Sequence, residues 1–118
     1  MSYQRSQVVI VNFPFSSGEG GKLRPALVLQ SDRNNSRLRN TIIAMITRTA
    51  RRAGEPTQLL IDVTTPAGQQ SGLAFTSAVT CENLFTVEQR LIRGRIGSLS
   101  PNVMQHVDGC LKASLGLS

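Results

Sequence analysis

The stretch RPALVLQSDRNNSRLRNTIIAMIT, residues 24–47, gives the first indication of how this chain folds. It holds two short apolar runs, ALVLQ at 26–30 and TIIAMIT at 41–47, on either side of a polar segment rich in arginine. Short apolar runs bounded by polar residues are typical of buried strands. The stretch therefore predicts two strands joined by a loop or by one short helical turn at 31–40.

Four further segments extend this sheet. QVVIVNF at 7–13 is β-branched and is followed by Pro14, TQLLIDV at 57–63 alternates in polarity, and residues 73–79 and 90–96 complete the set. Polar loops are expected at 16–22, 48–56 and 64–72, and residues 82–88 lie between the last two strands. Because no long helical segment separates these strands, the order predicts an antiparallel, barrel-like sheet.

One helix is expected at the end of the sequence. Ser100 and Pro101 provide a side-chain cap and a proline at the first helical position, and Gly116 suits the position after the last turn. Apolar or small residues recur between them at helical spacing: Val103, Val107, Cys110, Leu111, Ser114 and Leu115. A chain of 118 residues with no repeat and no linker fits a single domain, 1–118.

The charge of the chain is dominated by arginine. Thirteen Lys and Arg residues against seven Asp and Glu leave a net charge of +6, and eleven of the thirteen are Arg. The planar guanidinium group suits phosphate groups and base edges. Six of the arginines lie within twenty residues: Arg33, Arg37, Arg39, Arg48, Arg51 and Arg52. The cluster predicts a surface for a polyanion such as nucleic acid, and the alternative is a basic, solvated loop region.

Two positions at strand ends are candidates for chemistry. Arg24 immediately precedes a predicted buried strand, and Pro25 limits the backbone freedom of Arg24 as well as its own. Thr47 ends the next strand, just before the basic loop. Taken alone, Arg24 is better explained as an ordinary surface arginine. Thr47 is likewise better explained as a strand-forming threonine with a satisfied hydroxyl.

Several other chemistries are disfavoured. The glycine-rich loop is not a nucleotide-binding P-loop, because Leu23 follows Gly21-Lys22 where Ser or Thr is required. Its glycines favour a flexible flap instead. Cys81 and Cys110 are expected to be reduced thiols, and with His106 as the single histidine no metal site is expected. A catalytic Cys–His pair stays open as an alternative.

The chain is expected to be cytoplasmic. No stretch approaches the roughly 18 apolar residues of a membrane span. The start, Met-Ser-Tyr-Gln-Arg, leads into a predicted strand without the apolar core of a signal peptide.

Five segments, in this order and spacing, resemble the MazF/PemK toxins of type II toxin–antitoxin pairs. They cover nearly the whole chain: GEGGKLRPALVLQSD at 18–32, IIAMITRTAR at 42–51, PTQLLI at 56–61, SGLAFTSAVTCENLFTVEQRLI at 71–92 and RIGSLSPNVMQHVDGCLKASLGL at 95–117. The RPALV element after a glycine-rich loop, the IT at the end of a strand and the late run of Cys, Glu, Asn and Thr form a combined signature. No single piece would be sufficient.

The resemblance implies a mainly β fold with α-helices: an SH3-like antiparallel barrel with a C-terminal helix and a short appended helix, of the CcdB/MazF/PemK kind. It also implies a homodimer, inhibited by a cognate antitoxin, that cleaves single-stranded RNA at a short sequence without ribosome, metal or cofactor. In the family pattern, the arginine before the proline and the threonine of the IT element carry the chemistry. These residues are Arg24 and Thr47 here.

The resemblance also suggests supporting residues. Glu82 and Glu19 are candidates for catalysis or substrate positioning, and the predicted RNA-binding set is Arg48, Arg51, Arg52, Ser31, Ser77 and Asn83. Three positions depart from the pattern. Asn83 stands where the family often has Gln, Thr80 stands where some members have Arg, and the flap has Glu19-Gly20 instead of Glu-Gln. These departures bear on the cleavage sequence rather than on the catalytic pair.

Two alternatives to an RNA-cutting toxin remain at the level of sequence. The CcdB toxins have a similar barrel and bind DNA gyrase without cutting RNA, which would leave Arg24 and Thr47 without a purpose. A basic RNA-binding module would show the same charge and no cleavage.

Overall fold

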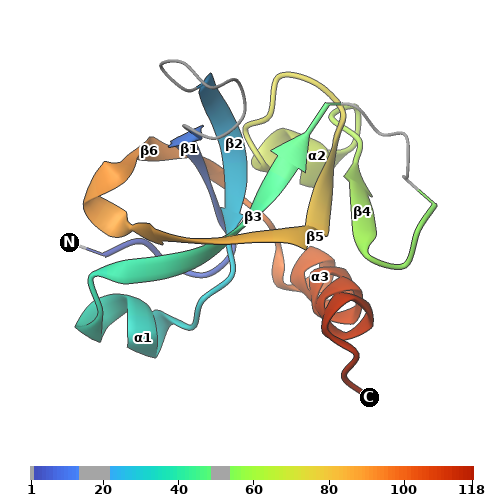
Figure 1. Cartoon of the computed structure of the whole chain (residues 1–118). Helices are drawn as coiled ribbons and strands as arrows, with labels where there is room; N and C mark the ends of the chain where they lie inside the picture. The colour runs from blue at the N-terminus through green and yellow to red at the C-terminus, as the bar shows by residue number, and fades with distance from the viewer. Residues whose placement is uncertain (1, 14–21, 49–53) are drawn as a thin grey trace.

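The computed structural model describes residues 2–13, 22–48 and 54–118. Figure 1 shows their arrangement as a curled sheet with a long helix against it. The elements are β1 (Gln7–Phe13), β2 (Lys22–Val28), α1 (Asp32–Arg37), β3 (Asn40–Thr47), β4 (Gln58–Ile61), α2 (Pro66–Gln70), β5 (Ser77–Glu88), the short 3-10 helix η1 (Gln89–Leu91), β6 (Ile92–Ser98) and α3 (Pro101–Leu115).

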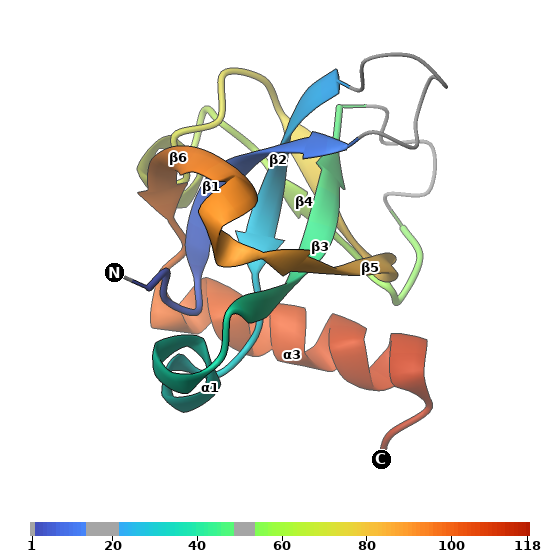
Figure 2. The same ribbon diagram turned by 60° about the vertical axis from the view of Figure 1, so that its left-hand side comes forward.

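The strands form one sheet with the order β4-β5-β3-β2-β1-β6, in which every neighbouring pair is antiparallel. The sheet curls on itself (Figure 2). The short helix η1 connects the end of β5 to β6. The core inside this curl draws on β1, β2, β3 and β6: Val9, Val11, Phe13, Ala26, Val28, Ile43 and Ile92, with Phe85 and Val87 of β5 packed against it. The predicted antiparallel barrel with a C-terminal helix and a short additional helix is confirmed.

The outer face of the sheet forms a second core under α3. Its members include Leu27, Ala44, Ile46 and Val79 from the strands, and Met104, Val107 and Cys110 from the helix. The predicted helix ends are confirmed: Ser100 Oγ accepts a hydrogen bond from Val103 N at 3.3 Å, and Gly116 has a φ of 70°. Leu115 is 56% exposed and lies outside the core. None of the helices in the described ranges is both long and apolar enough to cross a bilayer.

β5 corrects the sequence prediction for this region. A strand at 73–79 and a separate segment at 82–88 were expected, whereas β5 runs from Ser77 to Glu88 without a break. A β-bulge explains the difference: Ala44 pairs with Leu84 while the next residue, Met45, pairs with Thr80. The extra residues bend the strand, as bulges do, and the polar residues at the bend interrupt the apolar pattern. One strand therefore serves both cores.

β2 is also longer than predicted at its start. It begins at Lys22, so Arg24 lies within the strand, paired with Val11 of β1, and not before it. Pro25 is tolerated because the hydrogen-bonded ladder with β3 begins only at Ala26. The short helix α2 occupies the predicted polar loop at 64–72, where Thr65 caps it by accepting a hydrogen bond from Gly68 N at 3.0 Å.

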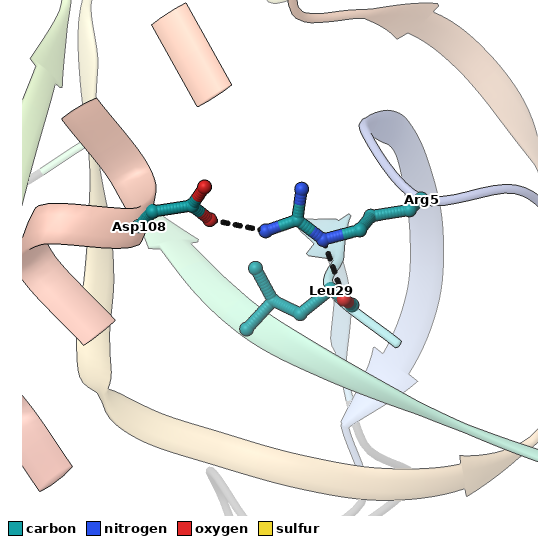
Figure 3. Close-up of polar contacts among 3 residues, drawn as sticks. All are labelled: Arg5, Leu29 and Asp108. Atoms are coloured by element: carbon teal, nitrogen blue, oxygen red, sulfur yellow. Dashed lines mark hydrogen bonds and ion pairs between the residues drawn. The ribbon is translucent and has the colours of Figure 1, made fainter. Parts of the chain in front are cut away.

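Two polar side chains connect the start of the chain to the rest of the fold. Arg5 Nε donates to the carbonyl of Leu29 at 2.9 Å, and its Nη2 forms an ion pair with Asp108 of α3 (Figure 3). Gln89 is the second of these side chains, and it is buried. Its Nε2 donates to the carbonyls of Asn35 and Leu38, and its Oε1 accepts from the backbone N–H of Tyr3 at 2.9 Å.

Candidate active site

The register of the sheet sets Arg24 opposite Thr47. Ala26 of β2 pairs with Met45 of β3. Continuing that antiparallel register by two residues places Arg24 across from Thr47, and residues two apart on a strand point to the same face. Thr47 in turn pairs with Ala78 of β5. The two candidate residues therefore share one end of the sheet and one face, the face that lines the barrel core.

One N–H donor of the Arg24 guanidinium group, the Nε atom, has no hydrogen-bond partner among the described residues. The residue is partly buried, and its Nε is inaccessible to solvent yet makes no hydrogen bond within the residues that the structure describes. Buried donors are almost always paired, so such an atom calls for an explanation. A guanidinium group prefers bidentate contact with carboxylate or phosphate oxygens. Arg24 is thus a candidate to bind an anion at this end of the sheet.

A polar group on β4 and β5 continues the same face. Gln58 of β4 pairs with Thr80 of β5, which pairs with Met45. The Gln58 Nε2 atom donates a hydrogen bond of 2.6 Å to Oε2 of Glu82, which is partly buried. Asn83 Nδ2 donates to the Thr80 hydroxyl at 3.2 Å. The carboxylate of Glu82 is therefore held from the neighbouring strand β4, and Glu82 itself lies on β5, the strand that pairs with Thr47 at Ala78.

The other predicted residues are placed differently. Ser31 caps α1 by accepting a hydrogen bond from Asn34 N, at the opposite end of β2 from Arg24. Ser77 is buried, and its hydroxyl donates to the carbonyl of Phe75 at 2.7 Å. Arg48 is exposed immediately after Thr47. Three predicted residues, Glu19, Arg51 and Arg52, lie outside the described part of the chain.

The four members of the arginine cluster that the structure describes do not form one surface. Arg33 and Arg37 are on α1 and Arg39 immediately precedes β3, whereas Arg48 follows the last residue of β3. β3 has eight residues, and at about 3.3 Å per residue the two groups are separated by roughly 25 Å. Of these four positive charges, only that of Arg48 is at the end of the sheet that carries Arg24.

The two cysteines are poorly suited to nucleophilic catalysis. Cys81 and Cys110 are buried in the core under α3, and His106 is exposed on that helix. Burial, with a smaller contribution from the neighbouring thiol, raises the pKa of Cys81 to about 12. Burial likewise raises the pKa of Cys110. Because the thiolate is the reactive form, both groups are protonated and inert at neutral pH, which argues against the Cys–His alternative.

The fold and this site define a class: a small β-barrel with an arginine and a threonine opposite each other on neighbouring strands at one end of its sheet. A family model of the PemK-like, MazF-like toxins of type II toxin–antitoxin systems matches residues 4–115. The chain belongs to this family.

Known proteins of the family resemble it over most of its length. Endoribonuclease EndoA of Bacillus subtilis (strain 168) is 31% identical over 104 residues, which cover 88% of this chain and 85% of that protein. A mycobacterial endoribonuclease in complex with its cognate antitoxin has a TM-score of 0.78 and 20% identity, covering 99% and 98% of the two chains. A MazE–MazF complex (Form-III) from Deinococcus radiodurans has a TM-score of 0.72 and 26% identity, covering both chains fully.

The structure adds residues that the sequence did not single out. Gln58 reaches Glu82 only because β4 and β5 pair, a contact between residues 24 positions apart. Thr80 was noted only as a departure from the family pattern, yet it is buried and its hydroxyl donates to the carbonyl of Met45 at 2.7 Å. Phe75 lies before the start of β5, whereas the sequence placed it within a strand at 73–79 and so gave no reason to single it out.

Proposed function

We propose that this endoribonuclease toxin cleaves single-stranded RNA by attack of a 2′-hydroxyl on the adjacent phosphate, with Arg24 and Thr47 as its catalytic residues. The whole chain, 1–118, would act as one toxin domain in the cytoplasm. One observation carries the proposal: the register of the sheet sets Arg24, with its permanent positive charge, across from Thr47 on the same face. No metal and no cofactor take part in the proposed reaction.

The proposed chemistry requires three events at one phosphate. The 2′-hydroxyl loses its proton and attacks phosphorus, negative charge grows on the non-bridging oxygens, and the departing 5′-oxygen gains a proton. Arg24 donates two parallel N–H bonds to the non-bridging oxygens, where preorganised donors have their largest effect. Thr47 donates its hydroxyl to the same phosphate. The products carry a 2′,3′-cyclic phosphate and a 5′-hydroxyl.

Glu82 is the candidate acceptor for the 2′-hydroxyl proton, because a guanidinium group is a poor base. Its carboxylate is oriented by Gln58, whose Nε2 contacts Oε2 at 2.6 Å. Gln58 is therefore a positioning residue in this proposal.

Incubation of the pure protein with a long RNA in excess chelator tests the proposed function. We expect discrete fragments that end in a cyclic phosphate, because no step depends on a divalent ion. Detection of the ends by mass spectrometry identifies the chemistry. RNA that stays intact in chelator would refute the proposal and leave a binding module or a gyrase-binding toxin in its place.

The protein is also proposed to be a homodimer that an antitoxin inhibits. Large apolar side chains exposed on the single chain support a further interface, among them Leu23, Leu60 and Leu91. A partner with an acidic, partly disordered segment would complement the net charge of +6 and order on binding. Sedimentation at micromolar concentration should give the mass of two chains, and a monomer would count against the dimer.

The salt dependence of RNA binding tests the basic loop. If Arg48, Arg51 and Arg52 contact phosphates, replacing each with Ala should lower the magnitude of the log–log salt slope by about 0.7, the value for one contact on a single strand. Arg33→Ala, on α1 at the other end of β3, is the matched control and should leave the slope unchanged. An unaltered slope in all three loop variants would show that these arginines do not contact phosphates and that the loop is an ordinary solvated segment.

A further inference from the structure

Phe75 is an exposed aromatic ring close to the candidate active site. It is 54% exposed, whereas Phe13 and Phe85 belong to or pack against the barrel core. Among the residues that the structure describes, no other Phe or Tyr is classed as exposed. About half of this large apolar ring therefore stays in water in the free protein, and exposed apolar surface that is contiguous often marks a binding site.

Arg48 stacks on this ring. The central carbon of its guanidinium group lies 4.1 Å from the centroid of the Phe75 ring. A guanidinium group at this distance over an aromatic face makes a favourable cation–π contact. The pair joins a flat apolar surface to a permanent positive charge, and these are the two features with which proteins hold an unpaired nucleotide.

A pocket of about 220 Å³ opens beside the stack. Ile10, Pro25, Leu73, Ile96 and Ser77 line it together with Arg48 and Phe75. Drug-sized ligands occupy pockets of roughly 300–1,000 Å³, so this one suits a single flat group. The apolar side chains provide contact area, and the guanidinium group is the one charged group in the lining.

The loop that carries Phe75 is packed closely against β6. Gly72 has a φ of 74°, and a Cβ atom there would lie 2.0 Å from the carbonyl oxygen of Ile96. Gly97 faces the same segment, since its Cβ would lie 2.4 Å from the backbone of Ser71. These backbone contacts, which only glycine permits, fix the start of the loop at residues 71–72.

The pocket adjoins the candidate active site. Pro25 and Arg48 directly follow Arg24 and Thr47 in the chain. Because successive residues of a strand point to opposite faces, Pro25 points away from the face that carries Arg24, at the same end of the sheet. A strand of RNA with its scissile phosphate on Arg24 and Thr47 can therefore pass over this end and place a neighbouring base in the pocket.

We propose that Phe75, Arg48 and the adjoining pocket form a base-binding subsite, which stacks one nucleobase next to the scissile phosphate and contributes to the choice of cleavage site. This inference rests on the proposed RNA cleavage. It assigns a role in substrate recognition to Phe75. Arg48 would then contact a base of the RNA as well as a phosphate.

The absence of tryptophan from the chain permits a direct test. Phe75→Trp preserves an aromatic face and introduces the single tryptophan, which can be excited separately from Tyr3. An RNA with one deoxyribose at its mapped cleavage site, so that it binds without being cut, should quench this fluorescence by stacking. The same RNA with an abasic nucleotide at one position beside the scissile phosphate should not quench it.

Phe75→Leu measures the contribution of the ring. It keeps an apolar side chain and removes the stacking face, so RNA affinity should fall about tenfold or more, the effect of one stacked base. KM should rise with little change in kcat. The abasic RNA that fails to quench should bind Phe75→Leu as tightly as it binds the unmodified protein. The abasic change and the Phe75→Leu change both remove the same contact, so their effects should not add. Leu115→Ala, an exposed apolar residue on α3, is the control and should bind RNA normally.

The outcomes separate this inference from the proposed function. If the unmodified protein leaves RNA intact, the proposed function fails and the subsite fails with it. If the protein cuts RNA while Phe75→Leu binds and cuts it normally, the subsite alone is refuted. A loss of dimer mass, or weaker binding of a cognate antitoxin without any change for RNA, would also overturn the subsite, because the pocket would then be a protein interface.

Discussion

Arg24→Lys is expected to lower the rate of RNA cleavage by about 10²–10³, the typical loss when one preorganised donor to a transition-state oxyanion is removed. Lysine keeps the positive charge but loses the planar fork, and its ammonium group is a compact, strongly hydrated point charge. RNA binding should change little, because the charge remains. Single-turnover kinetics at saturating enzyme would measure the chemical step separately from binding.

Arg93→Lys is a matched control for this substitution. Arg93 is an exposed arginine on β6, a strand that does not pair with β2 or β3, so its replacement should leave the rate unchanged. Circular dichroism should show both variants folded. A rate for Arg24→Lys within a few-fold of the original would mean that the group acts only through its charge, and the bidentate contact would have to be abandoned.

A substrate with a single deoxyribose just 5′ of the scissile phosphate should bind with normal affinity and remain uncut. The proposed nucleophile is the 2′-hydroxyl of that sugar, and without it no cyclic phosphate can form. The expected loss is complete, whereas each protein substitution leaves residual activity. Mapping of the cleavage site on a long RNA must come first, since it fixes which sugar to replace.

The control for this substrate is the same oligonucleotide with its one deoxyribose placed two nucleotides away. It should be cut at the original site and at a comparable rate. Cleavage of the first substrate at the modified position would require water to be the nucleophile. That result would rule out the proposed roles of Arg24 and Thr47 in 2′-hydroxyl attack, although the fold and the family would stand.

The barrel was predictable because the relevant signals are local. The short apolar runs over β1 and β3, and the Ser100–Pro101 start and Gly116 end of α3, each lie within a few residues of sequence. β5 was not predictable in full, since the bulge opposite Ala44 and Met45 depends on its pairing with β3. Polar residues at that bend gave the pattern of two separate segments.

The candidate site was predictable only in part, and for a similar reason. Arg24 and Thr47 came from the family resemblance, and their joint face follows from a register that the sequence does not state. Gln58 became relevant through the pairing of β4 with β5. The sequence also suggested a proximity that the fold does not produce. Six arginines within twenty residues suggested one basic surface, but the length of β3 separates Arg39 and Arg48 at its two ends.

The contacts of Gln89 bear on how the protein should be handled. Its buried side chain accepts a hydrogen bond from the backbone N–H of Tyr3, and two residues later Arg5 forms an ion pair with Asp108 of α3. An affinity tag fused closely to the first residues would crowd these attachments. The chain end beyond α3 lies on the other side of the molecule from the start of β2 and the end of β3 (Figure 2), and Leu117 is 61% exposed. Surface immobilisation through the C-terminus would therefore leave the strand ends with Arg24 and Thr47 facing solution.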